Sequence, residues 1–275
     1  MTTAMQSADS ADSSARMRRR KEVSLVAVMS AELTKLKGSM VWTVVGILPV
    51  LVVLTSVVNT VLAGEAPENG WSTLWLRAAV VHGLFPLPVG IAALAALVWR
   101  PEHRGGNRAA LCGLPLRLSK LVVAKTMTVA LLAAVMQFIF WGFLVVVGIV
   151  TVGPDIAAVV KYALVSVIIV IASVPVAAFQ SGAAMLMRSF AMPVLVGFVA
   201  SGTATVLVMT KNPMVLFVLP HAVAVRAPQV GTGVLADSGS ITSVSILTLI
   251  VAAVTITCLT LLVSGRVIQR QDLSR

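Results

Sequence analysis

Side chains that could carry acid–base, metal or nucleophilic chemistry are scarce in this chain of 275 residues, which has 10 acidic residues and 3 histidines. Pumps and ion-coupled carriers place carboxylates or histidines within the membrane to bind protons and ions. Here the long apolar runs contain no acidic residue, and His82 is the one histidine inside such a run, near its outer end. No histidine–carboxylate pair has metal-binding spacing on one helix face, and the phosphate-binding pattern G-x-x-x-x-G-K-[ST] is absent. The sequence therefore predicts no catalytic residue, no metal site and no cofactor-binding site.

The polar segment Arg100–Lys120 is the stretch most suited to contact a soluble partner. It reads RPEHRGGNRAALCGLPLRLSK. Asn107 could cap a short helix over Arg108–Gly113, which Pro115 would then end. Such a helix, standing below the membrane, would give a soluble motor protein a surface to grip. The alternative is a positively charged loop that only fixes the orientation of the chain in the membrane, and composition favours the two interpretations equally.

A second candidate contact element precedes the first apolar run. Five apolar residues recur there at near-helical spacing, namely Leu25, Val26, Met29, Leu33 and Leu36, while Lys21, Glu32 and Lys35 share another face. This pattern predicts an interfacial helix over residues 21–38. The alternative role of the region is simple attraction of the basic run Arg16–Lys21 to anionic lipids, and both roles are compatible.

These elements must be held by membrane-spanning helices, because 58% of the residues are hydrophobic, 11% are charged and the mean hydropathy is +0.99. That composition excludes a soluble domain, disorder over most of the chain and, with two cysteines, a disulfide scaffold. Six apolar runs are long enough to cross a bilayer: Ser39–Ala63, Ala78–Trp99, Leu121–Val150, Tyr162–Met187, Ala191–Thr210 and Ile241–Ser264. We predict an all-α polytopic membrane protein with six transmembrane helices over residues 39–265. Residues 1–20 form a disordered tail with a basic end, and residues 266–275 form a cytoplasmic tail.

The basic residues predict the orientation of these spans. Seventeen of the 21 lysine and arginine residues fall on the side that holds both termini, and Arg77, Lys161, Lys211 and Arg226 fall on the other. The positive-inside rule therefore places both termini in the cytoplasm of a cell whose membrane the chain crosses several times. The net charge of +11 is explained by this topology, so no nucleic-acid partner is expected. Tryptophans near the span ends, with Tyr162, are interpreted as an aromatic belt that anchors the protein in lipid.

Several features within and between the spans carry further predictions. Pro86 and Pro88 should bend the second span, and the small residues Ser173, Ala177 and Ser181 should allow close packing within the chain. Residues 214–226 are too short to cross the bilayer, so we expect a re-entrant or interfacial helix there, with His221 on the surface.

Three short motifs, in order along the chain, resemble those of the six-helix permeases of the ABC type-2 exporter family. Ala31–Lys37 contains an E-x-x-K segment before the first span, and Glu102–Asn107 resembles the start of the family's coupling loop. Leu114–Arg117, followed by Lys120-Leu121 and Ala124-Lys125, resembles its entry into the third span. Family members include permeases that serve lantibiotic immunity and drug efflux.

The resemblance implies a transport subunit that is not itself an enzyme. Two such chains, identical or sister chains, would pair with two cytoplasmic ATP-binding cassette ATPases, which would bind the ATP and Mg²⁺. The residues implied to contact the ATPase are Glu102, His103, Arg104, Gly106, Asn107, Arg108, Leu114 and Pro115. The second and fifth spans would line the route of the cargo, which places His82, Phe85, Ser201, Thr203 and Thr205 on that route. For Gln137 and Gln180 we expect interhelical hydrogen bonds instead.

The expected activity is ATP-driven export of an amphipathic or hydrophobic cargo, such as an antimicrobial peptide, a drug or a lipid-like molecule, across a bacterial plasma membrane. Antibiotic resistance or lantibiotic immunity would result from such efflux. The same spans also fit a membrane immunity or scaffold protein that binds a peptide or protein without transporting it. A membrane enzyme acting on lipid is a third hypothesis, which lacks a catalytic constellation in the sequence.

Overall fold

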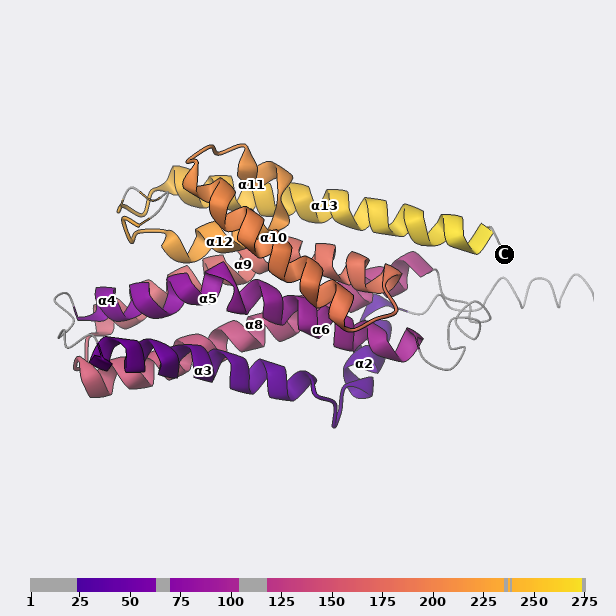
Figure 1. Ribbon diagram of the computed structural model, residues 1–275. Helices are drawn as coiled ribbons and strands as arrows, with labels where there is room; N and C mark the ends of the chain where they lie inside the picture. Colours follow the sequence, from indigo (N-terminus) through magenta and orange to yellow (C-terminus); the bar gives the residue numbers. More distant parts are fainter. Residues whose placement is uncertain (1–23, 63–69, 104–117, 235–236, 238, 274–275) are drawn as a thin grey trace, which may run out of the picture.

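The computed structural model describes residues 24–62, 70–103, 118–234, 237 and 239–273, and every regular element in this part of the chain is a helix (Figure 1). The first half comprises α2 (Leu25–Lys35), α3 (Val41–Leu62), α4 (Trp71–Trp75), the π-helix η1 (Leu76–Val80), α5 (Val81–Leu84) and α6 (Pro86–His103). The second half comprises α8 (Leu118–Thr151), α9 (Ile156–Leu186), α10 (Ala191–Met209), α11 (Val215–Val218), α12 (Pro220–Arg226), the 3₁₀ turn η2 (Ala227–Gln229) and α13 (Ser243–Leu273). Helix α2 and the C-terminal end of α13 lie at the same end of the bundle.

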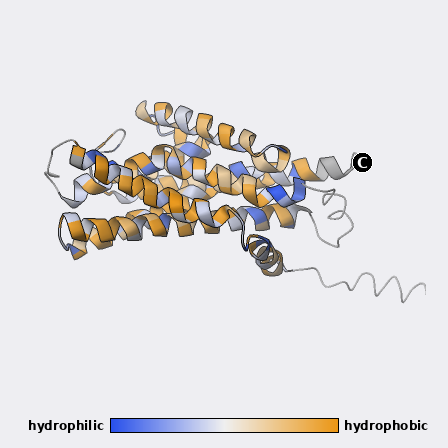
Figure 2. Ribbon diagram, turned by 60° about the horizontal axis from the view of Figure 1, so that its bottom comes forward, coloured by the Kyte–Doolittle hydropathy of each residue, from blue (hydrophilic) through white to orange (hydrophobic). Residues whose placement is uncertain are grey.

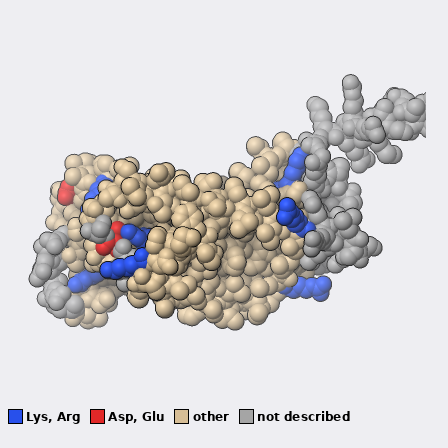
Figure 3. Space-filling view, turned by 90° about the horizontal axis from the view of Figure 1, so that it is seen from above, with Lys and Arg blue, Asp and Glu red and all other residues tan. Residues whose placement is uncertain are grey.

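The fold is that of a polytopic membrane protein. Helices α3, α8, α9, α10 and α13 are each long and apolar enough to cross a bilayer. The segments Trp71–Leu84 and Pro86–His103, bent by 41° where they meet, make a sixth span if the bent pair counts as one. The view in Figure 3 shows the charged side chains near the two ends of the molecule, with an uncharged belt between them. The predicted fold class is therefore confirmed, with five or six candidate spans.

Proline breaks the second span, as the sequence predicted. At Phe85 the backbone leaves helical values, with φ −134° and ψ −52°. Pro86 supplies no N–H group, and its ring disfavours helical backbone in the residue that precedes it. The span also begins at Trp71 rather than at Ala78, because α4 and η1 extend it toward the end opposite α2.

Helix α9 begins earlier than the predicted span, at Ile156 rather than at Tyr162. The reason is an N-cap: the Asp155 carboxylate accepts hydrogen bonds from the backbone N–H groups of Ala157 (3.0 Å) and Ala158 (3.2 Å). Hydropathy alone predicted where the apolar segment begins, whereas the N-cap at Asp155 determines where the helix begins.

Helix α13 also exceeds its predicted range, because it continues past Ser264 to Leu273. Most of the segment predicted as a tail, residues 266–273, is thus helical. Its basic residues do not stop the helix, since arginine and glutamine are good helix formers.

Small residues on α9 let neighbouring helices approach closely. Ser173, Ala177 and Ser181 are all buried, and a Cβ added at Gly182 would lie 2.7 Å from Ser264 Oγ of α13. These residues pack inside the chain, as predicted. Apolar residues also cover the outer faces of the long helices, as the hydropathy colouring in Figure 2 shows. That distribution fits helices that face lipid as well as each other.

The aromatic residues are mostly buried, so the prediction of a lipid-facing belt is wrong for four of them. Trp71, Trp75, Trp99 and Tyr162 are buried within the protein, and Trp42 is about half exposed, at 49%. The rings of Trp75 and Tyr162 stack with their centroids 4.5 Å apart. Sequence position near a span end locates a ring along the membrane normal but does not say which helix face carries it.

The segment between α10 and α13 folds back against the bundle instead of forming one interfacial helix. Helix α11 is half-buried except for the exposed Val218, whereas α12 is buried against α9 and α10, and η2 is buried against α9. His221, predicted to be a surface residue, has no exposed area and lies 3.1 Å from the side-chain amide nitrogen of Gln180. Pro220 starts α12 at a position where its missing N–H costs nothing, which turns the apolar run 220–225 inward.

Candidate functional site

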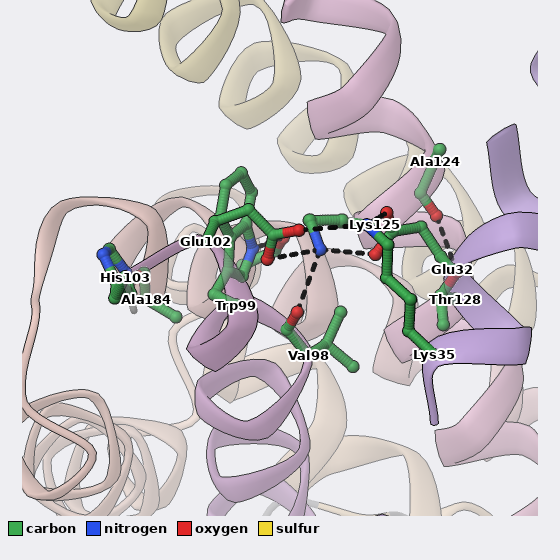
Figure 4. A network of polar contacts seen from close by, with 11 residues as sticks. Glu32, Lys35, Val98, Trp99, Glu102, His103, Ala124, Lys125, Thr128 and Ala184 are labelled. Atoms are coloured by element: carbon green, nitrogen blue, oxygen red, sulfur yellow. Dashed lines mark hydrogen bonds and ion pairs between the residues drawn. The ribbon is translucent and has the colours of Figure 1, made fainter. Parts of the chain in front are cut away.

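Lys125, in the first turns of α8, is fully buried and forms the centre of a cluster of charged side chains (Figure 4). Its ammonium Nζ lies 2.8 Å from Glu102 Oε2 and is also paired with Glu32 Oε2. The same nitrogen donates to the backbone carbonyl of Val98 at 2.9 Å. The ammonium thus donates hydrogen bonds to Glu32 and Val98 and forms an ion pair, without hydrogen-bond geometry, with Glu102 Oε2. The ring of Trp99 lies 5.2 Å from Nζ and adds a cation–π contact.

A second ammonium completes the cluster. Lys35 lies one turn after Glu32 on α2, and its Nζ is 2.6 Å from Glu32 Oε1 and 3.2 Å from Glu102 Oε1. Each carboxylate therefore contacts both ammonium groups. The two carboxylates are 4% exposed and Lys35 is 42% exposed. We name these four residues, Glu32, Lys35, Glu102 and Lys125, the ionic cluster; it joins α2, α6 and α8.

The charges around Lys35 shift its titration. Burial alone would lower the pKa of Lys35, but the hydrogen bond and charge of Glu32, with those of Glu102, outweigh this effect and raise the pKa above its ordinary value of 10.5. The ammonium form is thus favoured at every physiological pH. The cluster pairs two basic with two acidic side chains, so their formal charges cancel.

Helix α2 reaches the cluster through local capping and apolar packing. The Ser24 hydroxyl accepts a hydrogen bond from the Ala27 N–H (3.2 Å) and starts the helix. One turn on, Val28 packs against Leu121 and Ala124 of α8. This contact places the side of α2 that carries Glu32 against the bundle.

A helix, α2 (Leu25–Lys35), lies within the range 21–38 predicted for an interfacial helix, and its location at the membrane interface stays a prediction. The predicted polar face is wrong for Glu32, which is buried. Apolar spacing alone did not reveal this arrangement, because the partner of Glu32 is a buried lysine and not solvent. A short amphipathic helix can bury a carboxylate where a buried cation on a neighbouring helix forms an ion pair with it.

The end of α6 is tied to α9 as well. The Trp99 indole Nε1 donates to Ser181 Oγ at 2.8 Å, and His103 Nε2 lies 2.8 Å from the Ala184 carbonyl oxygen. Figure 4 shows these contacts beside the ionic cluster. The last turn of α6 is therefore fixed on one side by ion pairs to α2 and α8, and on the other by hydrogen bonds to α9.

Removing any one buried charge should destabilise the cluster. A buried charged group that loses its partner still bears the free-energy cost of its transfer out of water, and no ion pair offsets that cost. The protein is then typically destabilised by about 3–5 kcal/mol. The cluster is thus a rigid joint as long as all four charges are present. Its weakest point is the half-exposed Lys35, because water screens that ion pair.

The structure places two of the eight predicted ATPase-contact residues. Glu102 belongs to the ionic cluster, and His103 holds α9. The other six predicted residues lie outside the described part of the chain: Arg104, Gly106, Asn107, Arg108, Leu114 and Pro115. Sequence reasoning did not place Glu32, Lys35 and Lys125 in one cluster with Glu102, although all three lie in motifs that it had singled out. It also missed Trp99, which contacts Lys125.

Comparison with known proteins identifies the class of this chain. A family model described as "ABC-2 family transporter protein" matches residues 28–204, which include α2, the ionic cluster and the spans up to α10. The chain belongs to the ABC-2 transporter family. No curated protein and no solved structure gives a significant match. Members of this family are membrane permeases of ABC transporters, so the resemblance found in the sequence is confirmed.

The five predicted pathway residues of this ABC-2 permease occupy different environments. His82 has no exposed area, and its ring stacks on Phe140 at a centroid distance of 4.2 Å. Phe85 is half-buried and packs against Phe198 of α10 at 5.3 Å. The second span and α10 thus meet at Phe85, whereas His82 points into the packed interior.

The three hydroxyl residues on α10 satisfy their own helix. Ser201, Thr203 and Thr205 each donate to the backbone carbonyl four residues earlier, at 2.6–3.0 Å. Ser201 is buried, Thr205 is half-buried and Thr203 is exposed. The structure therefore does not bring all five predicted residues to one surface of the permease.

Gln137 and Gln180 form the interhelical contacts that were predicted for them. Gln137 Nε2 of α8 donates to Ser166 Oγ of α9 at 3.3 Å, and Gln180 of α9 contacts His221 of α12. Each pair connects helices of the same permease chain and stabilises their packing.

Proposed function

We propose that this ABC-2 permease is the membrane subunit of an exporter driven by a separate ATP-binding cassette ATPase. The single observation that carries the proposal is the ionic cluster at the start of the segment 104–117. Glu102 precedes that segment directly, and its carboxylate is bound to both α2 and α8. A displacement applied to this segment would therefore act on α2, α6 and α8 together.

The contacts of Trp99 and His103 extend this mechanical path to α9. Because α6 is anchored at its last turn and broken at Phe85, movement of its lower end tilts a segment about 18 residues long, or about 27 Å. The break lies where the second span meets α10. Such a lever converts a push at one end of the bundle into a change between the second span and α10, without any ionisable group in the membrane centre.

The cargo and its direction are inferred from the surfaces available. The spans are apolar, and α6 and α10 meet through aromatic and small residues such as Phe85, Phe198 and Gly202. These surfaces suit an amphipathic or hydrophobic cargo, such as an antimicrobial peptide, a drug or a lipid-like molecule, moved outward. We further propose that the chain works as a pair, with itself or a sister chain, in a bacterial plasma membrane with both termini in the cytoplasm.

The test is transport by vesicles that contain the chain with or without a partner ATP-binding cassette ATPase. A labelled cationic amphipathic peptide serves as the probe cargo, and peptide accumulation in inside-out vesicles is monitored after addition of ATP. We expect accumulation only when chain, ATPase and ATP are all present. Peptide binding by the chain that is unaffected by the ATPase, with no accumulation under any condition, would instead support a scaffold or immunity protein that does not transport.

A further inference from the structure

A small cavity lies at the end of the bundle opposite α2, between the last turn of α10, α11, α12 and the start of α13. Its volume is about 210 Å³. The polar part of its wall comes from Lys211, Asn212, Arg226 and Ser245, and the apolar part includes Val208, Leu216 and Leu249. The cavity takes no part in the path from Glu102 to α10, so any role of the cavity is independent of the proposed function.

Arg226 lines this cavity with a guanidinium group whose hydrogen-bond donors are only partly satisfied. Its Nη2 donates to Asp237 Oδ1 at 2.7 Å, whereas its Nη1 is buried and has no hydrogen-bond partner among the described residues. A buried guanidinium nitrogen without an acceptor is costly, because its contact with water has been lost and nothing replaces it. An acceptor oxygen from a ligand in the cavity would remove that cost.

Asp237 does not supply that acceptor in this structure, because its hydrogen bond to Arg226 goes to Nη2 alone. While Oδ1 accepts from Arg226, Oδ2 accepts from the backbone N–H groups of Thr232 (3.0 Å), Gly233 (3.0 Å) and Gly239 (2.9 Å). This carboxylate thus fixes the loop and holds the guanidinium in place. It neutralises one of the two cations that line the cavity and leaves the wall with a net positive charge.

Lys211 supplies the second cation in a conformation that its side chain makes unfavourable. Its φ is +58°, and it is the one non-glycine residue with positive φ in the described part of the chain. The position ends α10, where a glycine would adopt this backbone without strain. Lys211 is exposed and, like Arg226, lines the cavity.

The rim of the cavity is lipophilic. Val244, at the start of α13, lines the cavity and is 74% exposed. Helix α11 lines it through Val215 and Leu216, and Met214 and Val218 at the two ends of this helix are 63% and 78% exposed. The two cations match the charged headgroup of an anionic amphiphile, and the exposed apolar side chains match its acyl chains. The cavity itself is large enough for a phosphate headgroup but not for acyl chains, which would lie along the rim and in the bilayer.

We propose that this cavity binds the phosphate group of an anionic amphiphile, with Arg226 and Lys211 as its ligands. Arg226 Nη1 would donate to one phosphate oxygen while Nη2 keeps Asp237, and Lys211 would pair with a second oxygen. Arginine suits the buried position because its two terminal nitrogens serve two acceptors at once. A free phosphate ion offers the same oxygens without the acyl chains, so the two sources are separated by experiment.

The test measures binding of phosphatidylglycerol to the full-length chain in detergent, by native mass spectrometry, with phosphatidylcholine as the neutral lipid. We expect Lys211→Gln to weaken phosphatidylglycerol binding about fivefold and to leave phosphatidylcholine binding unchanged. The matched control is Lys161→Gln, which removes an equivalent charge at the same end but outside the cavity. Equal weakening by the two variants would overturn the proposal, because it would show attraction by net charge alone.

Two further arms keep the proposal testable if a variant folds poorly. Arg226→Lys keeps a positive charge beside Asp237 and removes the second nitrogen, so we expect it to weaken phosphatidylglycerol binding as well. Ser245→Leu fills the cavity from α13 and should displace the lipid without changing any charge; unchanged binding in both variants would refute the site. Competition by millimolar inorganic phosphate would identify the phosphate group alone as sufficient, and its absence would show that the acyl chains are needed.

Discussion

The two ends of the bundle bury polar side chains in different ways. At the end that carries α2, four charged residues from three helices share their ion pairs, and the core of this arrangement is Lys125. At the opposite end, Trp75 stacks on Tyr162 and lies edge-on to Phe140, while Trp71 donates to the carbonyl of Gly153 at 3.0 Å. Removing one partner of a buried ion pair leaves an uncompensated charge, whereas truncating a stacked ring removes packing contacts. We infer that charge pairing holds the three helices of the α2 end together as one rigid unit, and that ring packing holds the opposite end.

Removing the central cation should give the largest effect at the α2 end. Lys125→Met leaves two buried carboxylates facing Lys35 alone, so we expect the free energy of unfolding in mixed micelles to fall by about 3–5 kcal/mol. Lys37→Met, an exposed lysine just after α2, is the matched control and should change it by less than about 0.5 kcal/mol.

A double variant tests whether the four charges act as a unit. Glu102→Gln combined with Lys125→Met leaves the neutral pair Glu32–Lys35, so it should be more stable than Lys125→Met alone. If the two losses simply added, the residues would not form one cluster and the contrast between the two ends would fail.

The opposite end should respond to a change of shape and not of charge. Trp75→Leu removes the ring that stacks on Tyr162 and leaves a partly filled space, with an expected loss of about 2 kcal/mol in unfolding free energy. Because no charge is involved, raising the salt concentration should leave this loss unchanged. A loss that salt reduces would contradict the view of the contact between Trp75 and Tyr162 as neutral packing.

Acid should weaken the loop at the end opposite α2. Burial alone would raise the pKa of Asp237, but hydrogen bonds from Gly233, Arg226 and Gly239 outweigh it and lower the pKa below its ordinary value of 3.8. The carboxylate therefore contributes stability that is present above pH 3.8 and is lost as the pH falls through the folded-state pKa. Asp237→Asn should cost about 1 kcal/mol at neutral pH, and calorimetry should show this difference shrinking only below about pH 4.

Alkali should weaken the α2 end, and only slightly. The raised pKa of Lys35 means that its contribution is complete below 10.5 and is lost as the pH rises through the folded-state pKa. Since Lys35 is half-exposed, Lys35→Gln should cost no more than about 0.5 kcal/mol at neutral pH. The difference in melting temperature between the two proteins should stay constant from about pH 6 to about pH 10. A difference that vanished at mildly acidic pH would contradict this assignment.

The sequence predicted the spans well, because continuous apolar runs and the composition leave few alternatives to membrane helices. It also located the break in the second span, since Pro86 acts through local backbone geometry. It could not predict the ionic cluster as a whole: Glu32 and Lys125 are 93 residues apart, and hydropathy says nothing about which helices become neighbours. The same limit explains His221 and Trp75, whose positions near span ends suggested exposure, while their burial depends on α9 and α8.

The central claim is that work reaches the spans through Glu102. The most direct measurement is the amount of labelled peptide accumulated per ATP hydrolysed, in vesicles that contain the chain and its ATPase, for the wild type and for Glu102→Gln, with Lys37→Gln as the control. The account predicts that Glu102→Gln still assembles with the ATPase and still permits hydrolysis, but moves about tenfold less peptide per ATP, as expected from losing roughly 1.4 kcal/mol of coupling. An unchanged ratio in Glu102→Gln, or accumulation by the chain alone without nucleotide, would contradict it.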